Sequence, residues 1–277
     1  MRSFVRRGHS FHLHVYEFFD VPDGVALVDA TKTLPKEALF FFENPTTGKP
    51  DLGPFSDLFR FKLLLEGGWY VDVDTICMAD NLPAGIRAWA QENPKLYPRV
   101  VNGAQICLPS KDPLAKVLYE RCLSLSKNFD TREDLGPNLL GDVILGAGLP
   151  PNMFGTPATF YPIDWIAIFK LVLPKYREEV RQKAGAAHFL AAYQSFFQYC
   201  GIDLACTPPV GSYLQELYET MAPDRMKEKT YSVEEMTQLV RTYFEQNRSW
   251  AIADLLEVAG PEILNDLGID SSKAGSP

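Results

Sequence analysis

The segment from Pro54 to Thr75 constrains the fold more than any other part of this sequence. Its first half is apolar at helical spacing, with Pro54 suited to a first helical turn. The pair Gly67–Gly68 then provides a stop signal for a helix. The residues that follow, WYVDV, are mostly aromatic or β-branched and favour a strand. The segment therefore predicts a helix over 54–66 that leads directly into a strand beginning near Trp69.

Two aspartates, Asp72 and Asp74, lie one residue apart at the end of this predicted strand. Alternation along a strand would point both carboxylates to the same face. Two such groups repel each other unless a cation lies between them, which is a first indication of a metal site. An Asp-x-Asp triplet in isolation is more often a solvated turn, so the triplet alone leaves that alternative open.

The rest of the chain alternates strands and helices up to about residue 150, and helices dominate afterwards. We expect strands over 11–19 and 99–110, and helices over 85–94, 112–129, 135–149 and 184–202. Two more helical patterns lie beyond residue 230. This order favours an α/β sheet domain with a helical C-terminal part.

Composition limits the class of protein. The chain has 277 residues and a net charge of -8, from 27 basic and 35 acidic side chains, which argues against non-specific nucleic-acid binding. The five cysteines include no CxxC pair, so reduced thiols in the cytoplasm are expected. No apolar run is long enough for a transmembrane helix.

The stretch SDLFRFKLLLEGGWYVDVD resembles the signature of glycosyltransferases with a DXD-containing sugar-binding region. This family includes fungal initiating mannosyltransferases, bacterial capsule and lipopolysaccharide transferases, and clostridial toxin glucosyltransferases. The positions that agree are Asp57, Arg60, Leu63, Leu64, Gly67, Gly68, Trp69, Tyr70, Asp72 and Asp74. Weaker agreement extends over roughly residues 3–220.

The resemblance implies a GT-A-like fold, a Rossmann-like mixed sheet flanked by helices. It implies a transferase domain over 1–222 that lacks the family's first strand, and a helical C-terminal extension over 223–277. By the same resemblance, Asp57 and Arg60 contact the donor sugar and its phosphate, and Asp72 contacts the ribose or sugar. Asn102 is placed near the donor sugar, and Ser212 near the pyrophosphate.

The metal ligands also follow from the resemblance. Asp74 would bind Mn²⁺ or Mg²⁺, with Asp72 and His188 as further candidates. A divalent cation and a fixed guanidinium suit this chemistry, because the diphosphate leaving group develops negative charge.

The function implied is transfer of a hexose or hexosamine from a nucleotide-diphosphate sugar, with a UDP-sugar favoured. The acceptor would be a glycan, a lipid-linked sugar or a protein, and the anomeric configuration would be retained. Bacterial polysaccharide biosynthesis is the expected setting, in the cytoplasm or at the inner face of the membrane. A degenerate binding or scaffold protein without turnover is the rival hypothesis, and a metal-dependent hydrolase is a third.

Several of these residues also have purely structural interpretations. Asp57 and Arg60, three apart on a helix, would then form an ordinary surface pair. Asn102 would cap a turn, and His188 would be a core histidine among alanine and phenylalanine. Ser212, which follows Gly211, would be the N-cap of a helix.

Overall fold

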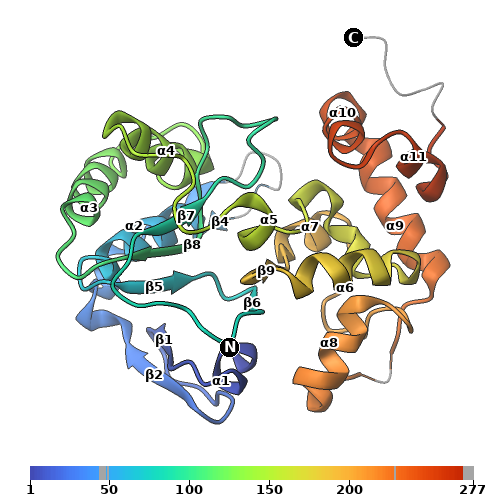
Figure 1. Ribbon diagram of the computed structural model, residues 1–277, viewed down its shortest axis with the longest axis horizontal. Coiled ribbons are helices and arrows are strands. Elements are labelled where there is room, and N and C mark those ends of the chain that lie inside the picture. The colour runs from blue at the N-terminus through green and yellow to red at the C-terminus, as the bar shows by residue number, and fades with distance from the viewer. Residues whose placement is uncertain (44–47, 49, 228, 271–277) are drawn as a thin grey trace. The chain divides into compact units, whose positions relative to one another are not determined.

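The computed structural model describes residues 1–43, 48, 50–227 and 229–270 (Figure 1). The chain divides into two compact units, Met1–Tyr161 and Pro162–Pro277, and each is described by itself. The predicted boundary between residues 222 and 223 therefore lies inside the second unit. Both units contain helices and strands, so the mixed α/β class expected from the sequence is confirmed.

The first unit contains all but one of the strands that the structure describes. Its strands are β1 (Phe11–Val15), β2 (Val25–Asp29), β3 (Phe42–Glu43), β4 (Pro50–Asp51), β5 (Gly68–Val71), β6 (Thr75–Cys77), β7 (Ala88–Ala90) and β8 (Asn102–Leu108). Its helices are α1 (Arg2–Arg6), η1 (Ala30–Lys32), η2 (Lys36–Ala38), α2 (Gly53–Leu63), α3 (Pro113–Leu125), η3 (Arg132–Asp134), α4 (Pro137–Gly146) and α5 (Pro157–Phe160).

The strands of the first unit form small sheets. Strands β5, β8 and β7 form a three-stranded antiparallel sheet in that order, and Val71 of β5 lies opposite Gln105 of β8. The parallel pair is β1 with β2, and β3 pairs antiparallel with β4. The expected Rossmann-like sheet is not evident in the described residues, because β5 is only four residues long and its partner β8 runs antiparallel to it.

The core of the first unit lies between β8 and the helices α2, α3 and α4. It includes Phe61 of α2, Ile106 of β8, Leu118 of α3 and Leu140 of α4, all fully buried. Helix α2 has proline in its first turn, as expected, and it is followed by Gly67 at φ 81°. A Cβ atom on Gly67 would lie 2.4 Å from the backbone nitrogen of Ser110, so only glycine fits where α2 passes into β5.

The helix predicted over 85–94 is wrong. Residues Ala88–Ala90 form β7 instead, and the side chain of Trp89 is fully buried. Tertiary burial of Trp89 in the core and pairing with β8 outweigh the helical propensity of Ala, Arg and Gln.

The second unit is mainly helical, which confirms the expected helical C-terminal part. Its elements are η4 (Trp165–Leu171), η5 (Pro174–Tyr176), α6 (Arg177–Gly185), β9 (Phe189–Ala191), α7 (Gln194–Tyr199), α8 (Tyr213–Met221), η6 (Pro223–Arg225), α9 (Val233–Gln246), α10 (Arg248–Ala259) and α11 (Glu262–Leu267). The long helix expected over 184–202 is interrupted by β9, and Tyr193 at φ 44° separates this strand from α7.

Aromatic rings fill the core of the second unit. Phe169 of η4 contacts Phe196 of α7 and Phe244 of α9, at centroid distances of 6.4 and 5.9 Å. Among the residues that the structure describes, no helix combines the length and the apolar composition needed to cross a membrane.

Candidate functional site

The two aspartates of the DVD triplet lie in a turn between β5 and β6. Strand β5 ends at Val71, and the backbone nitrogen of Thr75 donates a hydrogen bond to the carbonyl oxygen of Asp72 at 2.9 Å. Val73, between the two aspartates, is 65% exposed. The strand alternation expected for Asp72 and Asp74 is therefore wrong, because a tight turn brings the chain out to solvent at this point.

Beneath this turn, the guanidinium of Arg60 joins two carboxylates. Its Nη1 lies 3.0 Å from Oδ1 of Asp57, and its Nη2 donates to Oδ1 of Asp72 at 3.0 Å. The hydroxyl of Tyr70 donates to the same Asp72 oxygen at 2.9 Å, and its ring lies 4.6 Å below the guanidinium carbon. Asp72 is thus held in place from two sides.

Burial separates these groups into an inner and an outer layer. The side chains of Arg60 and Asp57 are 7% and 10% exposed, whereas that of Asp72 is 32% exposed. The ordinary surface pair considered for Asp57 and Arg60 is therefore wrong. A buried guanidinium supports a carboxylate that reaches solvent.

Two glycines provide the space for this ion pair. A Cβ atom on Gly103 of β8 would lie 2.3 Å from Nη1 of Arg60. A Cβ atom on Gly136, the residue before α4, would lie 2.4 Å from Oδ2 of Asp57. A larger residue at either position would have to displace the charged end of Arg60 or of Asp57.

Burial and charge oppose each other at this site. Desolvation raises the pKa of Asp57 to about 6, although the neighbouring Arg60 favours its charged form. Burial also opposes the charge on Arg60, but Asp72, Tyr70 and Asp57 outweigh it and raise the pKa of the guanidinium. Burial and the nearby Asp72 raise the pKa of Tyr70, so its hydroxyl remains a hydrogen-bond donor at neutral pH.

A second group of polar side chains lies at the start of β8. Asn102 Oδ1 accepts from the backbone nitrogen of Ala104 at 2.8 Å, so its Nδ2 is the atom that donates to Glu92, also at 2.8 Å. The backbone nitrogen of Asp72 donates to the carbonyl oxygen of Ala104 at 2.8 Å, which places Asn102 beside the DVD turn. Asn102 thus binds its own backbone segment and Glu92, while its place near the donor sugar stays a prediction.

Tyr161 completes this arrangement. Its buried hydroxyl donates to the carbonyl oxygen of Asn102 at 3.2 Å and receives a hydrogen bond from the backbone nitrogen of Gln105. Both backbone groups belong to β8, near the irregular pairing of this strand with β7. Burial raises the pKa of Tyr161, with the carboxylates of Glu92 and Asp72 adding to the effect.

The donor set of this site fits a hard divalent cation only in part. Asp72 and Asp74 offer carboxylate oxygens at the turn, but no group of three or more His, Cys, Asp or Glu suited to a metal is found among the described residues. Mg²⁺ and Mn²⁺ accept one or two protein carboxylates and take further oxygens from water and substrate phosphates. A metal held jointly with a diphosphate is compatible with these residues.

The remaining predicted residues, His188 and Ser212, belong to the second unit. His188 precedes β9 and is partly exposed, and burial lowers its pKa. Ser212 is fully buried, and its hydroxyl accepts from the backbone nitrogen of Gln215 at the start of α8. The structure thus gives Ser212 the N-cap geometry, while the ligand roles of both residues stay predictions.

Sequence reasoning missed the roles of several residues at this site. Glu92 was assigned to a helix, and Tyr161 lies 59 positions from the backbone oxygen that it binds. Gly103 and Gly136 carry no signal on their own, since what they make room for is known only from the fold. For Tyr70 a signal existed, because its spacing from Asp72 places both side chains on one side of an extended chain.

No protein-family model, no curated protein and no solved structure matches this chain. What the chain does must therefore be argued from its own residues and from the signature that they resemble.

Proposed function

We propose that this protein is a metal-dependent glycosyltransferase that uses a nucleotide-diphosphate sugar. The observation that carries the proposal is the DVD turn, with Asp72 clamped by a buried guanidinium and a tyrosine hydroxyl. Buried charges are costly, and a chain keeps them most readily where they serve binding or catalysis. The resemblance of the 56–74 segment to a DXD signature supports the same conclusion.

In this proposal the residues of the first unit have distinct roles. Asp72 accepts hydrogen bonds from the ribose or sugar hydroxyls of the donor, in an orientation set by Arg60 and Tyr70. Asp57 keeps Arg60 in place, and Arg60 supplies positive charge near the diphosphate. Asn102, through Glu92, shapes the edge of the donor pocket.

Asp74, with Asp72, would hold Mn²⁺ or Mg²⁺ together with the diphosphate. When bound, the cation would neutralise charge that develops on the leaving group. The acceptor oxygen would bond to the anomeric carbon as the bond to the nucleoside diphosphate breaks, the hydroxyl proton would pass to the departing diphosphate, and the configuration would be retained. The acceptor is a glycan, a lipid-linked sugar or a protein, and the enzyme works in the cytoplasm.

Calorimetric titration tests this proposal directly. UDP and GDP are each titrated, with and without Mn²⁺, into the wild type, Asp74→Ala and the control Asp20→Ala. Asp20 is an exposed acid outside the DVD turn, so its loss changes net charge equally. We expect that one nucleotide, UDP by preference, binds only in the presence of Mn²⁺. Asp74→Ala should lower the affinity for this nucleotide about tenfold or more.

Turnover separates the rival hypotheses. A transferase releases UDP or GDP faster when an acceptor glycan is added, and Asp74→Ala abolishes the release. A binding or scaffold protein would bind the nucleotide without turnover. A hydrolase would release sugar equally fast with water alone. Absence of any metal-dependent nucleotide binding by the folded wild type would overturn the proposal.

A further inference from the structure

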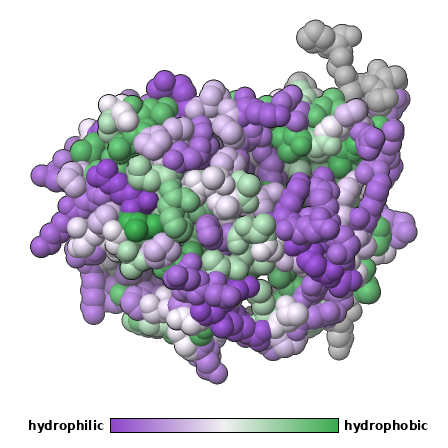
Figure 2. Space-filling view, in the orientation of Figure 1, coloured by the Kyte–Doolittle hydropathy of each residue, from purple (hydrophilic) through white to green (hydrophobic). Residues whose placement is uncertain are grey.

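A groove of about 500 Å³ lies between α3 and α4 of the first unit and is open to solvent. Its floor is apolar and is formed by Leu114 and Val117 of α3, Val143 of α4, and Leu149. Val117 is 43% exposed and adds apolar surface to the groove. Figure 2 shows hydrophobic residues at the upper left of the view, where Figure 1 places α4.

Small residues create this groove. The two helices pack through buried side chains such as Leu118 and Leu140, but at the end of α4 the groove is lined by Gly146 and Ala147. A Cβ atom on Gly146 would meet no atom within 4 Å. The groove is therefore open at this point, where glycine has no side chain and alanine has only a methyl group.

The groove carries one positive charge that no neighbour neutralises. Arg87 binds Asp112 through two hydrogen bonds of 2.7 Å, and Asp142 pairs with Arg99 at 3.0 Å. Arg121 also lines the groove, but it forms no ion pair with a residue that the structure describes.

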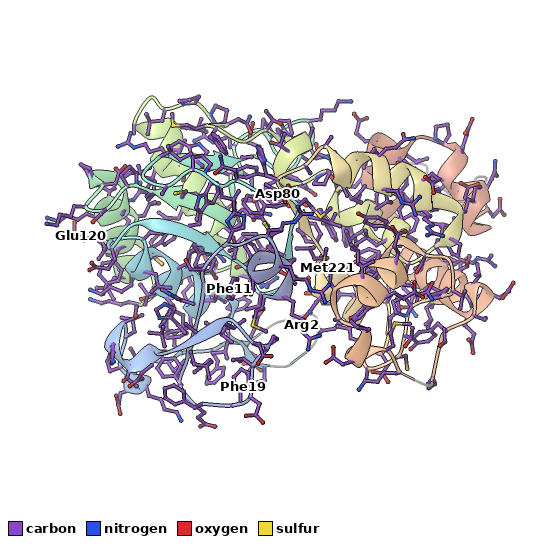
Figure 3. All side chains as sticks on the ribbon, turned by 60° about the horizontal axis from the view of Figure 1, so that its bottom comes forward. Arg2, Phe11, Phe19, Asp80, Glu120 and Met221 are labelled. Atoms are coloured by element: carbon purple, nitrogen blue, oxygen red, sulfur yellow. The ribbon has the colours of Figure 1, made fainter. Side chains whose placement is uncertain are left out.

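The charged residues next to Arg121 on α3 do not neutralise its charge. Lys116 and Glu120 lie 3.8 Å apart and neutralise each other, and Glu120 projects away from the body of the first unit (Figure 3). The uncompensated charge beside the apolar floor is thus the guanidinium of Arg121.

The groove is separate from the DVD turn. Strand β5 runs antiparallel to β8, and Gly68 lies opposite Leu108, whereas Val71 lies opposite Gln105. Helix α3 begins shortly after Leu108, at the end of the sheet where β5 starts, and the DVD turn lies where β5 ends. A ligand in the groove would not occupy the donor site.

We propose that this groove binds a single-chain anionic amphiphile, with its alkyl chain on the apolar floor and its carboxylate or phosphate head group at Arg121. The volume is in the range of small-molecule sites, and a mostly apolar lining with a few charged groups is typical of them. A guanidinium binds either anion through two donors. The ligand is a lipid monomer rather than a bilayer, since a membrane surface needs several basic groups and the groove supplies one.

Titration with decanoate, followed by NMR or calorimetry below its micellar concentration, tests this site. Nonyltrimethylammonium has the same nine-carbon alkyl chain and the opposite charge, and octanoate is two methylenes shorter. We expect decanoate to bind about three- to tenfold more tightly than the cation. Each methylene should contribute about two- to fourfold in affinity, because the groove is open on one side.

Two variants locate the binding. Gly146→Leu places a side chain in the groove without a clash and should abolish binding, whereas Arg121→Gln should remove the preference for the anion. Gly185→Leu is the matched control, because Gly185 also ends a helix, α6, and its Cβ would also meet nothing within 4 Å.

Each outcome decides the proposal. Binding that survives in Gly146→Leu, or equal affinity for both head groups, would overturn it. So would the absence of any decanoate binding by the wild type. Circular dichroism of each variant shows that the fold is intact, and nucleotide binding is measured separately as a test of the donor site.

Discussion

Each unit of this molecule buries a cation against carboxylates, but the two arrangements differ. In the first unit, Arg60 is shared between Asp57 and Asp72, and one of these acids reaches solvent. In the second unit, Lys170 of η4 binds both oxygens of Glu179 on α6, at 2.9 and 3.0 Å. Glu179 also accepts from Lys183 on the same helix, at 2.8 Å.

The difference indicates what each arrangement is for. Lys170 and Lys183 place two positive charges beside the single carboxylate of Glu179. The ammonium of Lys170 also lies 5.0 Å from the centre of the Tyr176 ring. All of these contacts tie η4 and η5 to α6, so they stabilise the unit. Arg60 instead holds Asp72 at an exposed turn, as the proposed donor site requires.

Removal of the buried cation should destabilise the two units by clearly different amounts. Arg60→Met leaves Asp57 buried without a partner, so we expect unfolding to become easier by about 3–5 kcal/mol. Lys170→Met leaves Glu179 partly exposed and still paired with Lys183, so the loss should be about 1 kcal/mol. Urea unfolding followed by circular dichroism measures both. Equal losses would mean that the two pairs are energetically alike.

The pH dependence of stability should have opposite signs in the two units. The pKa of Asp57 rises from 3.8 to about 6 on folding because of burial. Its proton is bound more tightly in the folded state, so its stabilising contribution is complete below pH 3.8 and is lost as the pH rises through about 6. The change is about 2–3 kcal/mol.

Glu179 behaves in the opposite way. Burial alone would raise its pKa, but Lys183 and Lys170 outweigh this and lower it below 4.5, so its contribution is present above that value and is lost as the pH falls. Unfolding free energies of the wild type, Asp57→Asn and Glu179→Gln are compared in steps between about pH 3 and pH 7. If the unfolding free energy of the wild type changed with pH in the same way as that of Asp57→Asn, the raised pKa of Asp57 would be contradicted.

Glycine substitution sharpens the comparison further. Gly136→Ala would place a methyl group against Oδ2 of Asp57, and we expect a loss of about 1–3 kcal/mol. Gly146→Ala, ten residues along the chain and at the end of the same helix, meets no atom. It should be neutral or stabilising by up to about 1 kcal/mol. Thermal unfolding of the two variants tests this, and equal midpoints would show that Asp57 can move aside.

The sequence predicts a helix or strand well when the residues that specify it lie within that element or next to it. Helix α2 with its glycine stop, strand β8 and helix α3 with its Asp112 cap follow from spacing and capping residues within a few positions. It fails for β7, where Ala88–Ala90 form a strand because of burial against residues distant in the chain. The same limit applies to the site. The DVD turn and Arg60 stand out in the sequence, but the contact of Tyr161 with Asn102 depends on the fold.

Ser212 offers the smallest and most specific test, since its two interpretations predict different results. As the N-cap of α8, its hydroxyl accepts from Gln215 N at 3.2 Å and is fully buried. Ser212→Ala should then cost about 1 kcal/mol of stability and leave metal-dependent nucleotide binding unchanged. Ser232→Ala is a matched control, because Ser232 caps α9 through the same contact to Glu235. A selective loss of nucleotide affinity in Ser212→Ala, at equal stability loss in the two variants, would instead give Ser212 a role in ligand binding.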